Sequence, residues 1–119
     1  MKQYESFDID LAMERAGGGI ARFIEMAEFF PSYLESIYRP IERAWQDQDM
    51  VLLSKSAHKL KGSLGMVGAT AAFSLAEELE KSAASSPPLK PDRCYQDLRQ
   101  ALEILTLDLK SFVKDHHAT

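Results

Sequence analysis

Apolar side chains recur every three or four positions along most of this chain, and no long segment alternates between apolar and polar residues. The first spacing is that of an amphipathic α-helix, and strict alternation would be that of a half-buried strand. The pattern predicts three long helices over residues 20–45, 50–64 and 69–83, and a fourth that begins near Pro91 or Asp92. Leucine and aromatic residues on the last segment follow alternating steps of three and four, which favours packing between helices.

Short polar or glycine-rich segments separate the predicted helices. Asp8 or Asp10 can accept hydrogen bonds at the start of a short first helix, and the glycines at 17–19 are expected to end it. Asp49 is placed to cap the helix that starts at the next residue. The Ser-Ser-Pro-Pro segment at 85–88 predicts a loop before the last helix.

Two prolines, Pro31 and Pro40, fall inside the long segment 20–45. Each proline lacks the backbone N–H that a helix interior uses, and its ring crowds the preceding turn. We therefore expect a kink or a restart of the helix near Pro31, and a weaker effect of the same kind at Pro40.

The predicted elements define the fold class. Four long amphipathic helices joined by short links bury their apolar faces most simply as an antiparallel up-down four-helix bundle, here with a short extra N-terminal helix. The expected fold is all-α. A chain of 119 residues has room for one core, so we expect a single domain over 1–119. Within it, the N-terminal lid helix should cover about 1–18 and the bundle about 20–115.

Charge and composition narrow the classes of partner. The net charge of −4 and the pI near 5.3 argue against nonspecific nucleic-acid binding and favour protein partners. No segment approaches the roughly 18 apolar residues of a membrane span, and the N-terminus lacks the layout of a secretory signal. We therefore expect a cytoplasmic protein without membrane contact. Cys94 is the only cysteine, which excludes an internal disulfide and a cysteine-based zinc site.

The sequence gives little support to a metal centre. His58 lacks a partner at the helical ligand spacing, and His116 and His117 are neighbours in sequence beside Asp115 rather than residues that converge on one point. We therefore expect no bound metal, and we expect the C-terminal histidines to belong to a frayed tail.

His58 occupies an unusual position in the segment 50–64. At roughly 100° per residue, the apolar residues of this helix fall within one arc. That arc consists of Leu53, Ala57, Leu60, Leu64 and Val67. His58, Lys55, Gly62 and Gly65 fall on the opposite side, so the core does not need the imidazole. Gly62 costs a helix about 1 kcal/mol relative to alanine, and its missing side chain opens access to the ring.

Positive charge surrounds His58 in an otherwise acidic chain. Lys55 precedes it by one helical turn, Lys59 follows it directly, and Lys61 lies one turn after it. An imidazole that titrates near neutral pH and can act as a nucleophile, next to these ammonium groups, suits a phosphoryl group. Lys61 could screen the oxygens of that group by charge-assisted hydrogen bonds. On these residues alone, a solvated surface with an incidental histidine remains an alternative.

The run His58-Lys59-Leu60-Lys61-Gly62-Ser63, followed by Gly68-Ala69, resembles the signature of the histidine-containing phosphotransfer (HPt) domain family. In that signature a histidine is followed by lysine and glycine three and four positions on, by a small residue, and then by glycine and alanine. The resemblance extends over nearly the whole chain. It includes the glycines near 18, the aromatic pair at 29–30, the turn at 47–49 and the Leu-Glu pair at 79–80.

The resemblance implies a phosphorelay intermediate that accepts a phosphoryl group from one receiver aspartate and passes it to another. His58 would be the phosphoacceptor, Lys61 the screening residue and Gly62 the clearance for the receiver. Glu80 stands where family members often place a polar residue, frequently glutamine, that accepts from the ring Nδ1–H and so holds the tautomer. Lys55 and Ser63 would complete the phosphoryl environment, although Ser63 has packing as its first expected role.

The resemblance also implies the partners. Response-regulator receiver domains and a hybrid sensor histidine kinase would exchange phosphoryl groups with a monomeric chain that has neither an ATP site nor kinase activity. Mg²⁺ is expected on the receiver rather than on this chain, where no cofactor is expected. Docking should use Ile9, Leu11 and Met13 of the first helix and the exposed side of the second.

Two other functional classes are weighed against this one. An interaction module would bind its partner while His58 stayed idle, but the joint presence of His58, Lys61 and Gly62 favours transfer. A kinase dimerisation domain usually has an acidic residue and a proline after its histidine, whereas Lys59 and Gly62 stand here.

Overall fold

The computed structural model of the protein describes residue 4 and residues 6–117, and these residues form five α-helices and no strand. The helices are α1 (Ile9–Ala16), α2 (Gly19–Gln46), α3 (Met50–Met66), α4 (Thr70–Ala84) and α5 (Pro91–His117). The predicted all-α class is confirmed, and the predicted boundaries of the long helices lie within two residues of the observed ones. The first helix, expected within a lid over about 1–18, covers only Ile9–Ala16. A loop at 85–90 connects the last two helices, as the serine and proline residues there predict.

Side-chain caps explain where two of the helices begin. Asp8 precedes α1 with extended backbone, and its carboxylate accepts a hydrogen bond from the Leu11 N–H. Asp49 does the same for α3 by accepting from the Leu52 N–H. Gly17, with φ of +71°, ends α1 in the left-handed region that glycine adopts without strain.

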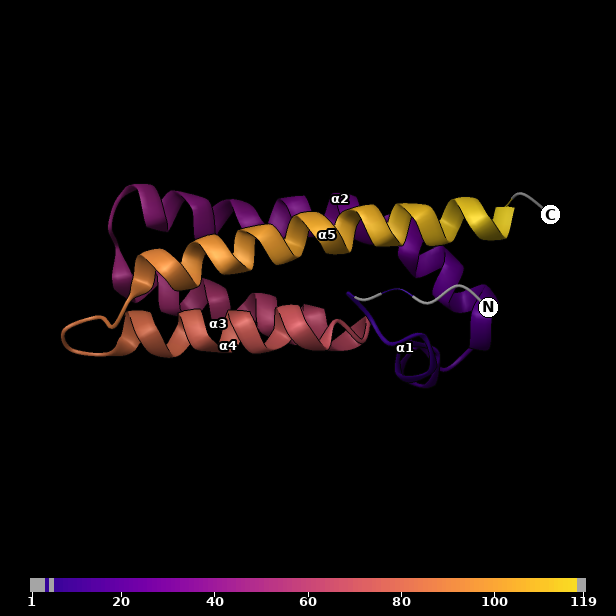
Figure 1. Ribbon diagram of the computed structural model, residues 1–119, viewed down its shortest axis with the longest axis horizontal. Coiled ribbons are helices and arrows are strands. Elements are labelled where there is room, and N and C mark those ends of the chain that lie inside the picture. Colours follow the sequence, from indigo (N-terminus) through magenta and orange to yellow (C-terminus); the bar gives the residue numbers. More distant parts are fainter. Residues whose placement is uncertain (1–3, 5, 118–119) are drawn as a thin grey trace.

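Helix α2 continues through both prolines, so the restart that we considered at Pro31 does not occur. Figure 1 shows its first turns inclined to the remainder of the helix. Apolar residues on both sides of each proline anchor α2 in the core, with Phe30 and Leu34 4% exposed and Ile41 fully buried. Their burial offsets the backbone hydrogen bonds that the prolines remove.

The four long helices lie side by side in an elongated molecule of 51 × 21 × 20 Å, with α2 and α5 along one side and α3 and α4 along the other (Figure 1). Helix α2 packs on α3 and α5, and α4 packs on the same two helices. The side chains between them form one continuous core. Its largest fully buried members are Phe23, Ile41, Leu53, Leu60, Leu64, Val67, Leu79, Leu98, Leu105, Leu109 and Phe112.

The segment before α1 closes one end of the core. Tyr4 stacks on Phe7 with ring centroids 5.2 Å apart, and Phe7 lies against Phe23 and Phe112. The Tyr4 hydroxyl donates a hydrogen bond to the Asp115 carboxylate at 2.5 Å. These contacts fix the N-terminal segment to both α2 and α5.

Helix α1 itself is attached to the far end of α3. The backbone N–H of Asp8 donates to the carbonyl oxygen of Gly68 at 2.9 Å, and the Arg15 guanidinium donates to the carbonyl oxygen of Gly65. Ile9 and Met13, which we expected to contribute to docking, are half-buried and pack against the core. Leu11 is half-buried as well.

The prediction of a frayed C-terminal tail is wrong at His116. Helix α5 extends to His117, and the His116 Nδ1 lies 2.8 Å from the Phe112 carbonyl oxygen. The ring of His116 also packs on that of Phe112, with centroids 4.1 Å apart. This stacking and the hydrogen bond hold the last turn in the helical conformation.

Two glycine variants test the backbone requirements of this fold. Gly68 has φ of +70°, and a Cβ there would lie 2.7 Å from the Asp8 carbonyl oxygen, so Gly68→Ala should lower the free energy of unfolding by about 2 kcal/mol or more. Gly62→Ala meets no neighbouring atom within 4 Å and should raise it by about 0.5–1 kcal/mol. Urea denaturation measures both changes, and equal stabilities of the two variants would contradict the backbone assignment.

Candidate functional site around His58

Helix α3 presents His58 to solvent, as the helical period predicts. The apolar arc of this helix is fully buried, with Leu53, Ala57, Leu60 and Leu64 each 0% exposed. The His58 side chain on the other side is 66% exposed. The imidazole therefore has no part in the core.

Glu80 of α4 holds the His58 ring in place. Its Oε2 lies 2.8 Å from Nδ1 of the imidazole, and its side chain is 24% exposed. An ionised carboxylate can only accept hydrogen bonds, so Nδ1 carries the proton in this contact. Among the described residues, Nδ1 is the ring atom with a hydrogen-bond partner, so Nε2 of the neutral ring presents its lone pair to solvent.

Lys61 lies next to the same carboxylate. Its ammonium nitrogen is 3.0 Å from Oε1 of Glu80 and 3.6 Å from Oε2 of Glu77, and it stands 5.9 Å from the centroid of the Phe73 ring. The Lys61 side chain is 20% exposed. Oε1 of Glu80 is shielded from solvent and makes no well-oriented hydrogen bond. The positive charge of Lys61, 3.0 Å away, compensates for the lost contact with water.

These contacts shift two ionisation equilibria in opposite directions. Burial acts to raise the pKa of Glu80, but the contacts with Lys61 and His58 outweigh it and hold that pKa below its ordinary value of 4.5. The contact with Glu80 is the largest influence on Lys61, and it raises the pKa of the ammonium above 10.5 against the opposing effect of burial. At neutral pH the site therefore contains a carboxylate and an ammonium.

The surface beside the ring is open. Gly62 is exposed, and a Cβ built on it would meet no neighbouring atom within 4 Å. His58, Gly62 and Met66 follow one another at four-residue steps, so they share one face of α3, where Met66 is 59% exposed. On α2, Phe29 is 66% exposed and stacks on Tyr33, whose hydroxyl lies near Ser63 of α3.

The structure brings together three of the predicted site residues, namely His58, Lys61 and Glu80. Lys55 is exposed, and no contact in the described part of the chain joins it to the ring. Ser63 is half-buried and turns toward α2, where its Oγ lies 3.4 Å from the Tyr33 hydroxyl.

Sequence reasoning missed Glu77, which lies one helical turn before Glu80 on α4. Its Oε1 is 3.4 Å from the Lys81 ammonium, while its Oε2 faces Lys61. The i, i+3 and i, i+4 spacings of these residues are visible in the sequence. Their relation to Lys61 is not, because it depends on how α3 and α4 are aligned.

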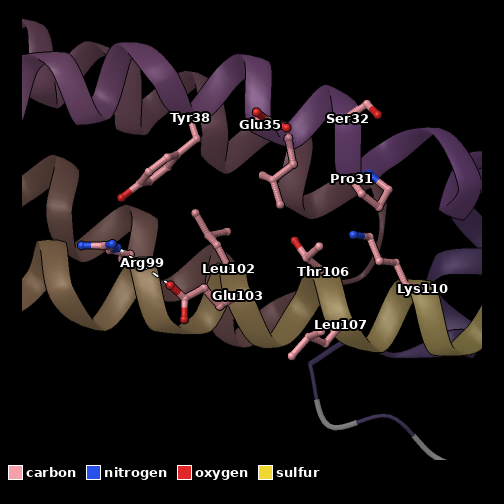
Figure 2. Close-up of a pocket in the computed structure, with 11 residues that line it drawn as sticks. Pro31, Ser32, Glu35, Tyr38, Arg99, Leu102, Glu103, Thr106, Leu107 and Lys110 are labelled. Atoms are coloured by element: carbon pink, nitrogen blue, oxygen red, sulfur yellow. Dashed lines mark ion pairs between the residues drawn. The ribbon is translucent and has the colours of Figure 1, made fainter.

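A groove of about 590 Å³ lies between α2 and α5, away from the helices that carry His58 and Glu80 (Figure 2). Tyr38 reaches into it from α2, and Arg99 pairs with Glu103 at 3.9 Å on α5. Burial is the largest cause of a strongly raised pKa of Tyr38, so its hydroxyl stays protonated. The residues that line the groove include no histidine or cysteine, so it offers no nucleophile comparable to His58.

The described residues contain neither a metal-ligand cluster nor a membrane-spanning helix. Over residue 4 and residues 6–117, no group of three or more His, Cys, Asp and Glu side chains is arranged to hold a metal ion. Among the described helices, none combines the length and apolar character that a membrane crossing requires.

Comparison with protein families agrees with the geometry of the site. The Hpt domain family matches residues 25–108, a range that includes His58, Lys61 and Glu80. Searches of curated proteins and of solved structures found no match. The chain belongs to the Hpt domain family, whose members take part in histidine phosphotransfer in two-component signalling and interact with receiver domains and kinases. The resemblance noted from the motif at 58–63 is thereby confirmed.

An NMR titration of the Glu80 side-chain carbonyl tests the charge arrangement. We expect a midpoint below 4.5 in the wild-type protein, so the stability that this carboxylate contributes is present above that pH and is lost as the pH falls through the lowered value. In Lys61→Met the midpoint should rise, because the burial that raises the pKa remains while its main opposing contact is lost. A Glu80 titration midpoint that is unchanged or lower in Lys61→Met would contradict this account.

Proposed function

We propose that this chain is a phosphorelay intermediate in which His58 accepts a phosphoryl group from one receiver aspartate and passes it to a second. The observation that carries the proposal is the 2.8 Å contact between Nδ1 and Glu80, combined with an exposed ring. This arrangement fixes the proton on one nitrogen and leaves the other free for attack. Donor and recipient would be receiver domains, one of them in a hybrid sensor histidine kinase.

The transfer step follows from the orientation of the ring. The Nε2 lone pair of His58 forms a bond to phosphorus while the P–O bond to the receiver aspartate breaks, and the electron pair leaves with the aspartate carboxylate. The ring keeps its Nδ1 proton and so gains a positive charge, which the Glu80 carboxylate stabilises. Transfer to the second receiver is the same step in reverse.

The neighbouring residues have supporting roles in this proposal. Lys61 screens the phosphoryl oxygens, and Gly62 provides the space that the receiver needs at the ring. Lys55 adds positive charge one turn before His58, whereas Ser63 serves packing through its contact with Tyr33. The receiver brings Mg²⁺, which neutralises charge during transfer, and this chain holds no cofactor and has no ATP site.

Receiver docking is proposed on exposed apolar residues of α2 and α3, with α1 in a smaller part than the sequence indicated. Met66 follows Gly62 by one turn on α3, and Tyr33, on which the exposed Phe29 stacks, reaches Ser63 next to Gly62; the exposed area of these residues suits a modest, transient interface. Because Ile9 and Met13 are half-buried, α1 contributes at most the edge of this surface.

The finer architecture belongs to the same proposal. We infer that α2, α3, α4 and α5 form an antiparallel up-down four-helix bundle, since each connection between them is short and each helix packs on two others. The chain over 1–119 would act as one domain, as a monomer, in the cytoplasm.

Replacement of the acceptor tests the function directly. Incubation of the wild-type chain with a phosphorylated receiver and Mg²⁺ should give an acid-labile, base-stable label that maps to His58. His58→Ala should lose this label and all transfer to a second receiver. Among the described residues, no other imidazole is both exposed to solvent and held by a carboxylate at Nδ1. A His58→Ala variant that still relays phosphoryl groups would instead indicate an interaction module.

A bulky residue at Gly62 tests how the partner approaches. Gly62→Leu should slow phosphoryl transfer from a receiver by about tenfold to a hundredfold, because it displaces the aspartyl phosphate from in-line attack. Phosphoramidate is small enough to reach the ring past the new side chain, so it should still label His58. Unchanged transfer from the receiver would show that this face is not the one that docks.

A further inference from the structure

Glu77 is shared between two lysines. Its Oε2 lies 3.6 Å from the Lys61 ammonium and its Oε1 lies 3.4 Å from that of Lys81. Lys61 in turn is shared between two carboxylates, since it also lies 3.0 Å from Glu80. The order of charges along this network is therefore Lys81, Glu77, Lys61 and Glu80, followed by the His58 ring.

The two carboxylates do not hold Lys61 equally. The contact with Glu80 is shorter, and the Glu80 side chain is 24% exposed, whereas the Glu77 side chain is 39% exposed. Solvent screening weakens the more exposed and more distant pair. When a competing anion reaches Lys61, the contact with Glu77 is the first that it gives up.

A phosphoryl group on His58 is such an anion. Lys61 follows His58 by three residues on α3, a spacing that places the two side chains on one face of the helix. The phosphoryl oxygens on Nε2 would attract the ammonium of Lys61, and Glu80 would still be needed at Nδ1. The exchange of partners is therefore between Glu77 and the phosphoryl group.

We propose that Glu77 is a positioning residue that sets the phosphoryl-transfer equilibrium of His58, because it competes with the phosphoryl group for Lys61. This inference rests on the proposed function of His58. The negative charge of Glu77 stabilises the unphosphorylated state and so favours onward transfer to a receiver. Lys81 opposes this effect of Glu77, since the Lys81 ammonium next to Oε1 of Glu77 weakens the attraction between Glu77 and Lys61.

The equilibrium between the chain and a receiver measures this effect. The wild-type protein is mixed with a receiver domain charged by acetyl phosphate and freed of excess donor, and the ratio of phosphohistidine to aspartyl phosphate is followed until it is constant. That ratio at dilute concentration does not depend on how well the two proteins dock. Glu77→Gln should shift it toward phosphohistidine by a factor of about 1.5 to 5, the range expected for an exposed ion pair.

Matched variants separate the proposed route from a general charge effect. Glu78→Gln removes the same charge from the neighbouring exposed position of α4 and should leave the ratio unchanged. Lys81→Gln should shift the ratio in the opposite direction, toward the receiver. In a Lys61→Met background, Glu77→Gln should have no further effect, and raised salt should reduce its effect in the wild-type background.

The outcomes distinguish this inference from the function on which it rests. If the wild-type chain takes no label on His58, the relay function itself is wrong. If it is labelled but Glu77→Gln gives the wild-type ratio, the role of Glu77 is overturned and the relay function stands. A shift that persists in full in Lys61→Met also overturns the inference, because Glu77 would then act on the phosphoryl group directly.

Discussion

The close packing of α3 on α4 is the constraint on which the site depends, because each of these helices supplies only half of it. His58 and Lys61 come from α3, and the carboxylates that meet them come from α4. Both helices bury small residues, among them Ala57 of α3 and Ala76 of α4, each 0% exposed. Small side chains let helix backbones approach closely, and that approach brings a glutamate within hydrogen-bond distance of a ring on another helix.

Between these two helices, the Glu80 carboxylate interacts with two different groups. The two oxygens of Glu80 face different groups, one the imidazole and the other an ammonium, so the same side chain orients the ring and holds the cation next to it. Replacement by glutamine would keep an acceptor for Nδ1 and lose the charge that attracts Lys61. The glutamate therefore adds an electrostatic interaction to the ring environment that an amide would not supply.

The helical period was sufficient to predict much of the fold and the exposure of His58, because both follow from residues three and four positions apart. Of the kink or restart that it indicated near Pro31, the restart does not occur, since the burial of neighbouring aromatic and leucine residues keeps α2 one continuous helix. It could not identify Glu77, whose role depends on the register between two helices. Glu80 was identified only through the family resemblance, because no local pattern relates it to a histidine 22 positions earlier.

The exposure of a single ring nitrogen also determines the order in which receivers can bind to this chain. One Nε2 can face one aspartate, so two receivers would have to occupy the same face of α3 in succession. The first must dissociate before the second can bind, and the throughput of the pathway would then depend on residence times rather than on the chemical step. An unenclosed ring therefore favours rapid turnover of weakly bound partners over tight selection of one.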